Sequence, residues 1–535
     1  MRHVLIIVQQ MVALSMADGF ARVTNKPQAV IVHVDVGTQA LGPGIHNASC
    51  GRAPVLIFAG LSPYTLEGEI RGSRTEFIHW LQDVPDQKAI VSQYCRYTAE
   101  IKTAKNIKQI VNRALQFATS DPKGPVYLTG AREVMEEELD PYQIVQEQWS
   151  PVVTGLLPQS AVDEIATALV GADLPMIVTG FTGRRQESVP ELVKLAELVK
   201  GLRVFDAGTT EMSFPFNHRA SVNPTWGAGK LLESADVILV LDCDVPWIPT
   251  QRKPRANAKI YHIDVDPLKA QMSLFYIAAI ARYRADSCAA LAQLNTHLTS
   301  HPPLVSKLSD PVFSRRWTSL GETHTQNLQT SAAKAVFPAD GPNAPVNISF
   351  LSAQIRKHVP PETIYATEAV TNHVRMLEQL QPSLPGSSFT KGAGGLGWSC
   401  GAALGLKLAR PAAFVCCITG DGSFVFAHPT AVYWLSAHYC LPVLTVVLNN
   451  GGWVAPRVSA RHVLPGGLAQ SATAEELGIG FGDRPPDYGA VAEAAGRGWV
   501  RKARVERAGE VEGVLRRAVE VVKGGRGAVV DVLLG

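Results

Sequence analysis

Residues 418–426, ITGDGSFVF, place a carboxylate directly at the end of an apolar strand. The run AAFVCCIT at 412–419 leads into Gly420, Asp421, Gly422 and Ser423. A run that is apolar on both faces predicts a parallel strand covered by helices on both sides. Ligands of such sheets bind beyond the carboxyl ends of the strands, which is where Asp421 is expected. The stretch therefore predicts an α/β fold with a ligand site at Asp421.

A second polar turn follows the next strand along the chain. LPVLTVVL at 441–448 ends in Asn449, Asn450, Gly451 and Gly452. Neighbouring strands would then present a carboxylate, an amide oxygen and turn carbonyls to one point. Such hard oxygen ligands, with room left for water and phosphate oxygens, suit magnesium holding a diphosphate. The backbone N–H groups that follow Asp421 are in place to meet phosphate.

Strands alternate with helical segments three times along the chain. At 535 residues the chain is too long for one core. The pattern predicts the α/β class, with three doubly wound parallel-sheet domains at residues 1–150, 151–330 and 347–535. The stretch 300–346, richer in Pro, Ser and polar residues, is interpreted as a linker.

Composition narrows the classes of partner. Apolar residues make up 46% and charged residues 18%, which indicates a well-packed globular enzyme. The net charge of +3 and the lack of long Lys/Arg runs argue against nucleic acid as a partner. No stretch reaches the roughly 20 apolar residues of a membrane span, so no membrane partner is expected. Eight cysteines without a CxxC pair favour a reduced, cytoplasmic protein.

The first 20 residues carry one Arg, an apolar run and small residues, as a secretory signal would. Two glutamines interrupt that run, and the segment continues without a break into a helix, a turn and a strand, so a signal peptide is disfavoured. The segment also lacks the Arg- and Ser-rich pattern of a transit peptide, but a mitochondrial location remains the alternative if the true N-terminus differs.

GDGS at 420–423 followed by NN at 449–450 resembles the cofactor motif of the thiamine-diphosphate-dependent enzymes. The resemblance extends over nearly the whole chain. It is carried by ADGFARVTNKPQAVIVHVDVGTQAL at 17–41, AKIYHIDVDPL at 258–268 and GAGGLGWSCGAALG at 392–405. These segments resemble the pyrimidine-binding domain, the end of the central domain and the entry to the diphosphate-binding domain. The likeness is nearest to the acetolactate synthase and benzoylformate decarboxylase branch.

This resemblance implies roles for single residues. Asp421 and Asn450 would be side-chain ligands of Mg²⁺, with the carbonyl of Gly452 as a third. The carbonyl of Gly394 would accept a hydrogen bond from the aminopyrimidine, and Leu396 would be the apolar wedge that bends the cofactor. The implied diphosphate contacts, which match the family more loosely, are Thr371, Asn372, Gly422, Ser423 and Phe424.

Two other cofactors are considered and disfavoured. Residues 392–397, GAGGLG, satisfy the dinucleotide pattern G-x-G-x-x-G. That fingerprint needs a preceding apolar strand and an acidic residue about 20 positions on. PGSSFTK at 385–391 is a poor strand, and the next acidic residue is Asp421, which already has a better assignment. FAD, which some acetolactate synthases carry, is not expected because LDCDVPWIPTQR at 241–252 replaces the flavin-binding stretch.

The family's catalytic glutamate, which bonds the pyrimidine ring nitrogen, aligns with Gln10. An amide can hydrogen-bond this nitrogen but cannot exchange a proton with it at neutral pH. Either the chain is impaired, or its true N-terminal segment is missing together with the family's initial strand and helix; we favour the second. His33 matches an active-site histidine of the benzoylformate decarboxylase branch that aids proton transfers. The alternative is a histidine that merely ends a buried strand.

The sequence thus predicts a thiamine-diphosphate- and Mg²⁺-dependent decarboxylase or carboligase whose substrate is a small 2-oxo acid. Because the family binds the two ends of the cofactor on different subunits, a homodimer or homotetramer is implied. Two alternatives stay open: a 2-hydroxyacyl-CoA lyase, and a catalytically impaired thiamine-binding homologue.

Overall fold

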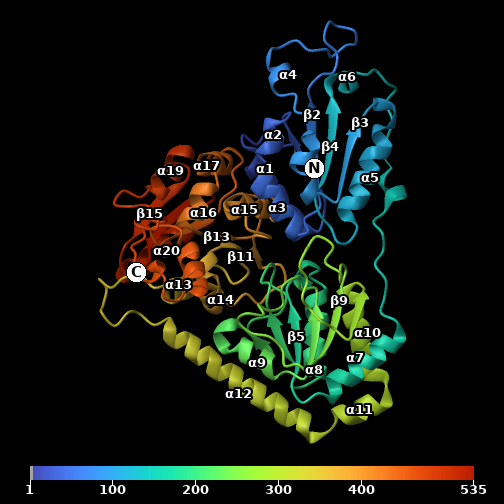
Figure 1. Ribbon diagram of the computed structural model, residues 1–535. Helices are drawn as coiled ribbons and strands as arrows, with labels where there is room; N and C mark the ends of the chain where they lie inside the picture. The colour runs from blue at the N-terminus through green and yellow to red at the C-terminus, as the bar shows by residue number, and fades with distance from the viewer. Residues whose placement is uncertain (1–3, 144) are drawn as a thin grey trace.

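The computed structural model describes residues 4–143 and 145–535. In these residues three all-parallel sheets follow one another along the chain, each flanked by helices (Figure 1). The predicted α/β class with three parallel-sheet domains is confirmed. Each sheet falls inside one of the predicted residue ranges. In the described chain, no helix combines the length and apolar character that crossing a membrane requires.

The N-terminal sheet has the strand order β1-β2-β4-β3. Its strands are β1 (Gln28–Val32), β2 (Val55–Leu61), β3 (Tyr97–Ile101) and β4 (Val126–Ala131). The main helices around it are α1 (Gln10–Thr24), α3 (Gly42–Cys50) and α5 (Ile107–Thr119). Helix α1 begins at Gln10 because the side chain of Gln9 accepts a hydrogen bond from the backbone N–H of Val12. Strand β1 lies at the edge of the sheet, and Ile31 on it is 78% exposed.

The central sheet has the strand order β10-β9-β8-β5-β6-β7. Its strands are β5 (Pro175–Thr179), β6 (Arg203–Asp206), β7 (Ser221–Val222), β8 (Val237–Leu241), β9 (Lys259–Asp264) and β10 (Ala281–Arg284). Helices α7 (Gln159–Gly171), α8 (Ser188–Leu198), α9 (Ala228–Ser234) and α10 (Ser287–Ser300) accompany it. The order reverses between β5 and β8, as in dinucleotide-binding sheets, so this is where a crevice is expected.

The C-terminal sheet has the strand order β12-β11-β13-β14-β16-β15. Its strands are β11 (Ile364–Glu368), β12 (Ser388–Thr390), β13 (Val415–Gly420), β14 (Leu444–Asn449), β15 (Arg501–Val505) and β16 (Ala528–Leu533). Its helices are α13 (Ile348–His358), α14 (His373–Leu380), α15 (Trp398–Ala409), α16 (Asp421–Phe426), α17 (Pro429–His438), α18 (Val454–Val463), α19 (Tyr488–Ala495) and α20 (Ala508–Lys523). Strands β13 and β14 pair directly, with Gly420 opposite Leu448. Asp421 and Asn450 therefore follow adjacent strand ends, as the sequence predicts.

Two expectations about local structure need correction. The segment 385–391, judged a poor strand, contains the edge strand β12, because it pairs with β11 on one side only and needs few apolar residues. The linker at 300–346 is largely helical, with α11 (Pro302–Leu308) and α12 (Pro311–Lys334). Proline is compatible with the first turn of a helix, and Asp310 caps α12 by accepting from the N–H of Val312.

The N-terminal and C-terminal domains contact each other closely through α1 and α15. A Cβ on Gly405 would lie 2.0 Å from the carbonyl oxygen of Met16, and one on Gly19 would lie 2.5 Å from that of Ala402. Only glycine permits this approach of two backbones. The indole of Trp398 also donates a hydrogen bond to Asp18, at 2.7 Å. These contacts hold the Gly-rich entry to α15 against the N-terminal domain.

Candidate functional site

Asp421 joins the turns that follow β13 and β14. Its carboxylate is 2% exposed and accepts hydrogen bonds from the backbone N–H groups of Gly422 at 2.7 Å, Gly452 at 2.9 Å and Asn450 at 3.1 Å. Burial raises the pKa of Asp421, while these N–H groups oppose the rise. The structure thus brings the three residues expected to hold the metal to one point.

The donor set at this point fits a small hard cation. The amide oxygen Oδ1 of Asn450 is buried and has no hydrogen-bond partner in the described part of the chain, although buried polar atoms are normally paired. Gly452 has φ 147°, and a Cβ there would lie 2.0 Å from the carbonyl oxygen of Ile479. One carboxylate, one unsatisfied amide oxygen and turn carbonyls suit Mg²⁺. Among the described residues, no group of three His, Cys, Asp or Glu forms a competing metal site.

The residues expected near the diphosphate differ in how accessible they are to a ligand. The N–H of Gly422 is engaged by Asp421, and a Cβ on Gly422 would lie 2.4 Å from Nε1 of Trp453, so that indole lies against the turn. Ser423 is buried, and the ring of Phe424 packs with Tyr433 in the core, so any ligand would meet the backbone of Phe424. Thr371 is exposed and Asn372 half-buried, in the turn after β11.

Glu368 is a site residue that the sequence reasoning missed. It ends β11, next to β13, and its two oxygens accept from the N–H groups of Gly397 at 2.8 Å and Ser399 at 2.9 Å. Burial raises its pKa, and Lys391 opposes the rise. Glu368 therefore occupies the amides at the start of α15 that a dinucleotide pyrophosphate would use. The sequence carried a signal for Glu368, because the strand segment ETIYATEA at 362–369 ends at the same sheet edge as Asp421.

The loop between β12 and α15 is held by Asn47 of the N-terminal domain. Asn47 donates to the carbonyl of Gly395 and accepts from the N–H of Ala393, both at 3.0 Å. Gly394, by contrast, is exposed, with no atom of the described residues within 4 Å of an added Cβ, and Leu396 is half-buried. The loop expected to contact the pyrimidine ring is thus fixed at its base and open at its tip. Nothing in the local sequence distinguished Asn47.

Gln10 and His33 lie together, but apart from the cluster around Asp421. Both line a cavity of about 230 Å³ along the exposed edge of β1. None of the residues expected to hold metal or diphosphate lines this cavity. His33 is exposed and its Nδ1 lies 3.3 Å from the carbonyl oxygen of Val34. Within one chain, the two catalytic candidates therefore face a different space from the metal candidates.

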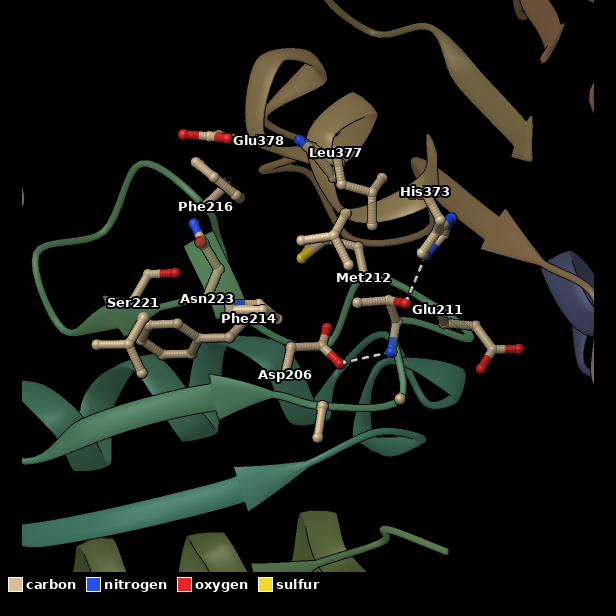
Figure 2. Close-up of a pocket in the computed structure, with 18 residues that line it drawn as sticks. Asp206, Glu211, Met212, Phe214, Phe216, Ser221, Asn223, His373, Leu377 and Glu378 are labelled. Atoms are coloured by element: carbon tan, nitrogen blue, oxygen red, sulfur yellow. Dashed lines mark hydrogen bonds between the residues drawn. The ribbon is translucent and has the colours of Figure 1, made fainter. Parts of the chain in front are cut away.

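A further cavity, of about 300 Å³, lies between the central domain and α14 (Figure 2). Asp206 and His373 face it among the apolar side chains of Met212 and Leu377. His373 directly follows the turn with Thr371 and Asn372, and its Nε2 lies 2.7 Å from the hydroxyl of Thr209. Burial lowers the pKa of His373 to about 4 and raises that of Asp206 to about 7. None of the sequence motifs described above predicts this cavity.

The raised pKa of Asp206 predicts a pH dependence of stability. Folded Asp206 keeps a proton that the unfolded chain releases near its ordinary pKa of 3.8. The contribution of Asp206 to the free energy of unfolding is therefore fully present below about pH 4 and is lost as the pH rises toward 7. We expect Asp206→Asn to abolish this loss of stability between pH 4.5 and pH 7.5. The urea midpoints of unfolding at these two pH values measure the loss. Asp173→Asn, which changes a side chain that is 91% exposed, is the control. An equal change in midpoint for wild type and Asp206→Asn would contradict it.

Three family models match the chain in order. They describe the N-terminal TPP binding domain at residues 2–90, the central domain at 162–293 and the C-terminal TPP binding domain at 369–532 of thiamine pyrophosphate enzymes. Benzoylformate decarboxylase of Pseudomonas aeruginosa is 24% identical, over 83% of this chain and 78% of that protein. Acetolactate synthase isozyme 3 large subunit of Escherichia coli is 24% identical, over 99% and 87%. Bovine (Bos taurus) 2-hydroxyacyl-CoA lyase 2 is 23% identical, over 98% and 83%.

Solved structures share the fold over its whole length. The thiamine diphosphate-dependent 4-hydroxybenzoylformate decarboxylase of Rhodococcus jostii RHA1 superposes with a TM-score of 0.77 at 21% identity, covering 99% of this chain and 91% of that one. Benzoylformate decarboxylase from Polynucleobacter necessarius gives 0.75 at 17% identity, with the same coverage. Since the three models of one family match in chain order over most of its length, the chain belongs to the thiamine pyrophosphate enzyme family.

Proposed function

We propose that this chain is a thiamine-diphosphate- and Mg²⁺-dependent enzyme that decarboxylates a 2-oxo acid and releases an aldehyde or ligates a second carbonyl compound. The observation that carries the proposal is the grouping of Asp421, Asn450 and Gly452, with the unsatisfied Oδ1 of Asn450, in a family defined by a diphosphate cofactor. The bound cofactor supplies the electron sink for loss of carbon dioxide.

The chain's own residues would hold and orient the cofactor. Asp421 and Asn450 would hold the ion that carries the diphosphate, while Trp453 covers the turn at Gly422. The carbonyl of Gly394 would accept from the aminopyrimidine, and Leu396 would press against the ring. Because Asn47 bonds both sides of this loop, it would keep Leu396 in position.

The complete site requires two copies of the chain. Gln10 and His33 line a cavity that none of the metal candidates shares, so one chain does not assemble both halves. Ile31, which lines that cavity, is 78% exposed, and Val36, three residues after His33, is 56% exposed. A two-fold assembly would cover these side chains and bring one copy's Gln10 to the other copy's Leu396. We propose a homodimer, or a homotetramer of two such dimers.

Gln10 would limit the proton transfer that activates the cofactor. We expect Gln10→Glu to raise the rate of hydrogen–deuterium exchange at the cofactor's reactive carbon by about 10²–10⁴-fold, since a carboxyl can trade a proton with the ring nitrogen and an amide cannot. NMR of cofactor isolated after timed acid quench measures this rate.

Gln9→Glu is the matched control for Gln10→Glu. Gln9 is adjacent in sequence, but its side chain caps α1 and its Nε2 lies 3.3 Å from Nε2 of His428, in another cavity. The Gln9→Glu variant should leave the exchange rate at the cofactor's reactive carbon unchanged. A Gln10→Glu variant no faster than wild type would show that this position does not limit activation. Exchange that stays at the rate of free cofactor in both proteins would favour the impaired, thiamine-binding homologue.

The crevice at the reversal of the central sheet disfavours FAD and coenzyme A. Arg52 of the N-terminal domain enters it, stacks on Phe181 at 4.6 Å and pairs with Asp244 at 2.7 Å. Lys269 is likewise paired, with Asp244 at 2.6 Å and with Asp264. These cations are committed to carboxylates rather than free for a nucleotide diphosphate. We therefore prefer the 2-oxo acid reaction to the 2-hydroxyacyl-CoA lyase and expect no FAD.

All eight cysteines are free thiols, which agrees with a reducing compartment. We propose the cytoplasm, with the mitochondrion as the alternative.

A further inference from the structure

A cavity of about 380 Å³ lies between helix α12 and the amino ends of β5, β6 and β7. This is the edge of the central sheet opposite to the crevice that Arg52 fills. Figure 1 shows α12 running along the side of the central domain that faces away from the N-terminal domain. The volume is in the range of small-molecule pockets, about 300–1,000 Å³. None of the residues discussed for the thiamine site lines it.

Three guanidinium groups converge on this cavity with little negative charge to balance them. Arg203 reaches only the carbonyl oxygen of Gly201, at 3.4 Å. Arg219 reaches the carbonyl oxygen of Trp317 at 3.5 Å and lies over its ring. Neither pairs with a carboxylate among the described residues. Arg316 pairs with Asp173 at 3.2 Å, but that side chain is 91% exposed and is held weakly.

Close packing holds these positive charges together. The side chain of Arg316 passes over Gly201, where an added Cβ would lie 2.9 Å from its Cδ, and Arg219 lies over Gly321 of α12, at 3.3 Å. Arg203 and Arg316 are near enough that the charge of Arg316 adds to burial in lowering the pKa of Arg203. Like charges held together in a half-buried cavity cost free energy unless an anion joins them.

A buried histidine on α12 also points to a ligand. His324 lines the cavity and is 6% exposed. Among the described residues no partner meets hydrogen-bond geometry at either ring nitrogen, although the backbone of Ser221 and Asn217 lies close enough to oppose the lowering of its pKa by burial. Trp226 holds its ring edge-on, at 5.3 Å between centroids, and the indole of Trp226 is itself fixed by a 2.8 Å bond to Ser331. A neutral imidazole can donate one hydrogen bond to an oxygen in the cavity.

We propose that this cavity is a phosphate-binding site that joins α12 to the central domain. Guanidinium groups bind phosphate oxygens in pairs of parallel hydrogen bonds, and three of them around one cavity balance a doubly charged group. The ligand is inorganic phosphate or the phosphate of a small monoester; both offer the same chemistry to Arg203, Arg219 and Arg316. A bound phosphate stabilises the contact of α12, which leads to the C-terminal domain, with the central sheet. The site is independent of the thiamine chemistry proposed above.

Isothermal titration of the full chain, saturated with thiamine diphosphate and Mg²⁺ and at constant ionic strength, tests this site. Inorganic phosphate and AMP are titrated separately. Arg219→Gln is the main variant because Arg219 is exposed, so its replacement should leave the fold intact, and Arg316→Gln is the second. Arg517→Gln, at an exposed arginine of α20, is the matched control.

We expect saturable binding of at least one probe, weakened at least ten-fold in Arg219→Gln and in Arg316→Gln and unchanged in Arg517→Gln. Tighter binding of phosphate identifies the free ion as ligand, and tighter binding of AMP identifies a monoester. The proposal is overturned if neither probe binds at millimolar concentration, or if binding persists unchanged in both cavity variants. The second result would place the phosphate elsewhere on the protein.

Discussion

Asp421→Asn is expected to weaken the binding of thiamine diphosphate in the presence of Mg²⁺ by at least about 100-fold, or roughly 2.7 kcal/mol. Asp421 is the carboxylate of the candidate metal site, and its two oxygens accept from three backbone N–H groups. An amide of the same shape removes the negative charge. It also points an NH₂ group, which is itself a donor, at backbone N–H groups that need an acceptor. Calorimetric titration with cofactor and Mg²⁺ measures the loss, and activity should fall with it.

Asp531→Asn is the control for this effect. Asp531 is also buried on the C-terminal sheet, but it binds Asn449 at 3.0 Å and Arg504 at 3.2 Å and lies outside the two turns. It should change the cofactor affinity by less than a few-fold. Asn450→Ala, which removes the unsatisfied oxygen and keeps the backbone, should fall between the two. Wild-type affinity in Asp421→Asn would remove the metal site, and with it the proposed function.

Arg22→Met is expected to lower the free energy of unfolding by about 3–5 kcal/mol, the usual cost of breaking a buried ion pair by removing one partner. Arg22 lies at the junction of all three domains. It pairs with Glu211 at 2.8 Å and donates to the carbonyls of Thr210 at 2.7 Å and Thr390 at 2.8 Å. Burial opposes ionisation of Glu211, but Arg184 and Arg22 together hold its pKa below the ordinary value. Without Arg22, two carbonyls and part of that charge stay buried without a partner.

The midpoint of the first urea transition measures this loss, because the junction should open before the individual domains. Arg71→Met is the matched control: Arg71 forms a 2.9 Å pair with Glu136, but its side chain is 70% exposed, so the expected change is below about 1 kcal/mol. Equal changes in the two variants would mean that the junction contributes little to stability.

The helical connection between the central and C-terminal domains shows where reading local residues fails. Prolines and polar residues at 300–346 favoured a linker, yet Pro302 and Pro311 stand in the first turns of α11 and α12. Proline marks a helix start as readily as a loop, and only the residues after the proline separate the two cases. In α12 those residues bury Phe313, Leu320 and His324 against the central domain, a contact that has no local signal.

The sequence by itself determined the parallel α/β architecture and the meeting of Asp421 with Asn450. Apolar strands that end in polar turns are a local pattern, and parallel pairing of β13 with β14 brings their carboxyl ends to one edge. Only the tertiary structure decided what surrounds that edge. Three polar side chains make their contacts across long stretches of chain. Glu368 binds the first amides of α15, Asn47 holds the Gly-rich loop, and Arg22 joins three domains. The packing of whole domains determines their partners, because a buried polar group is stable only when it is hydrogen-bonded in the place where the fold puts it.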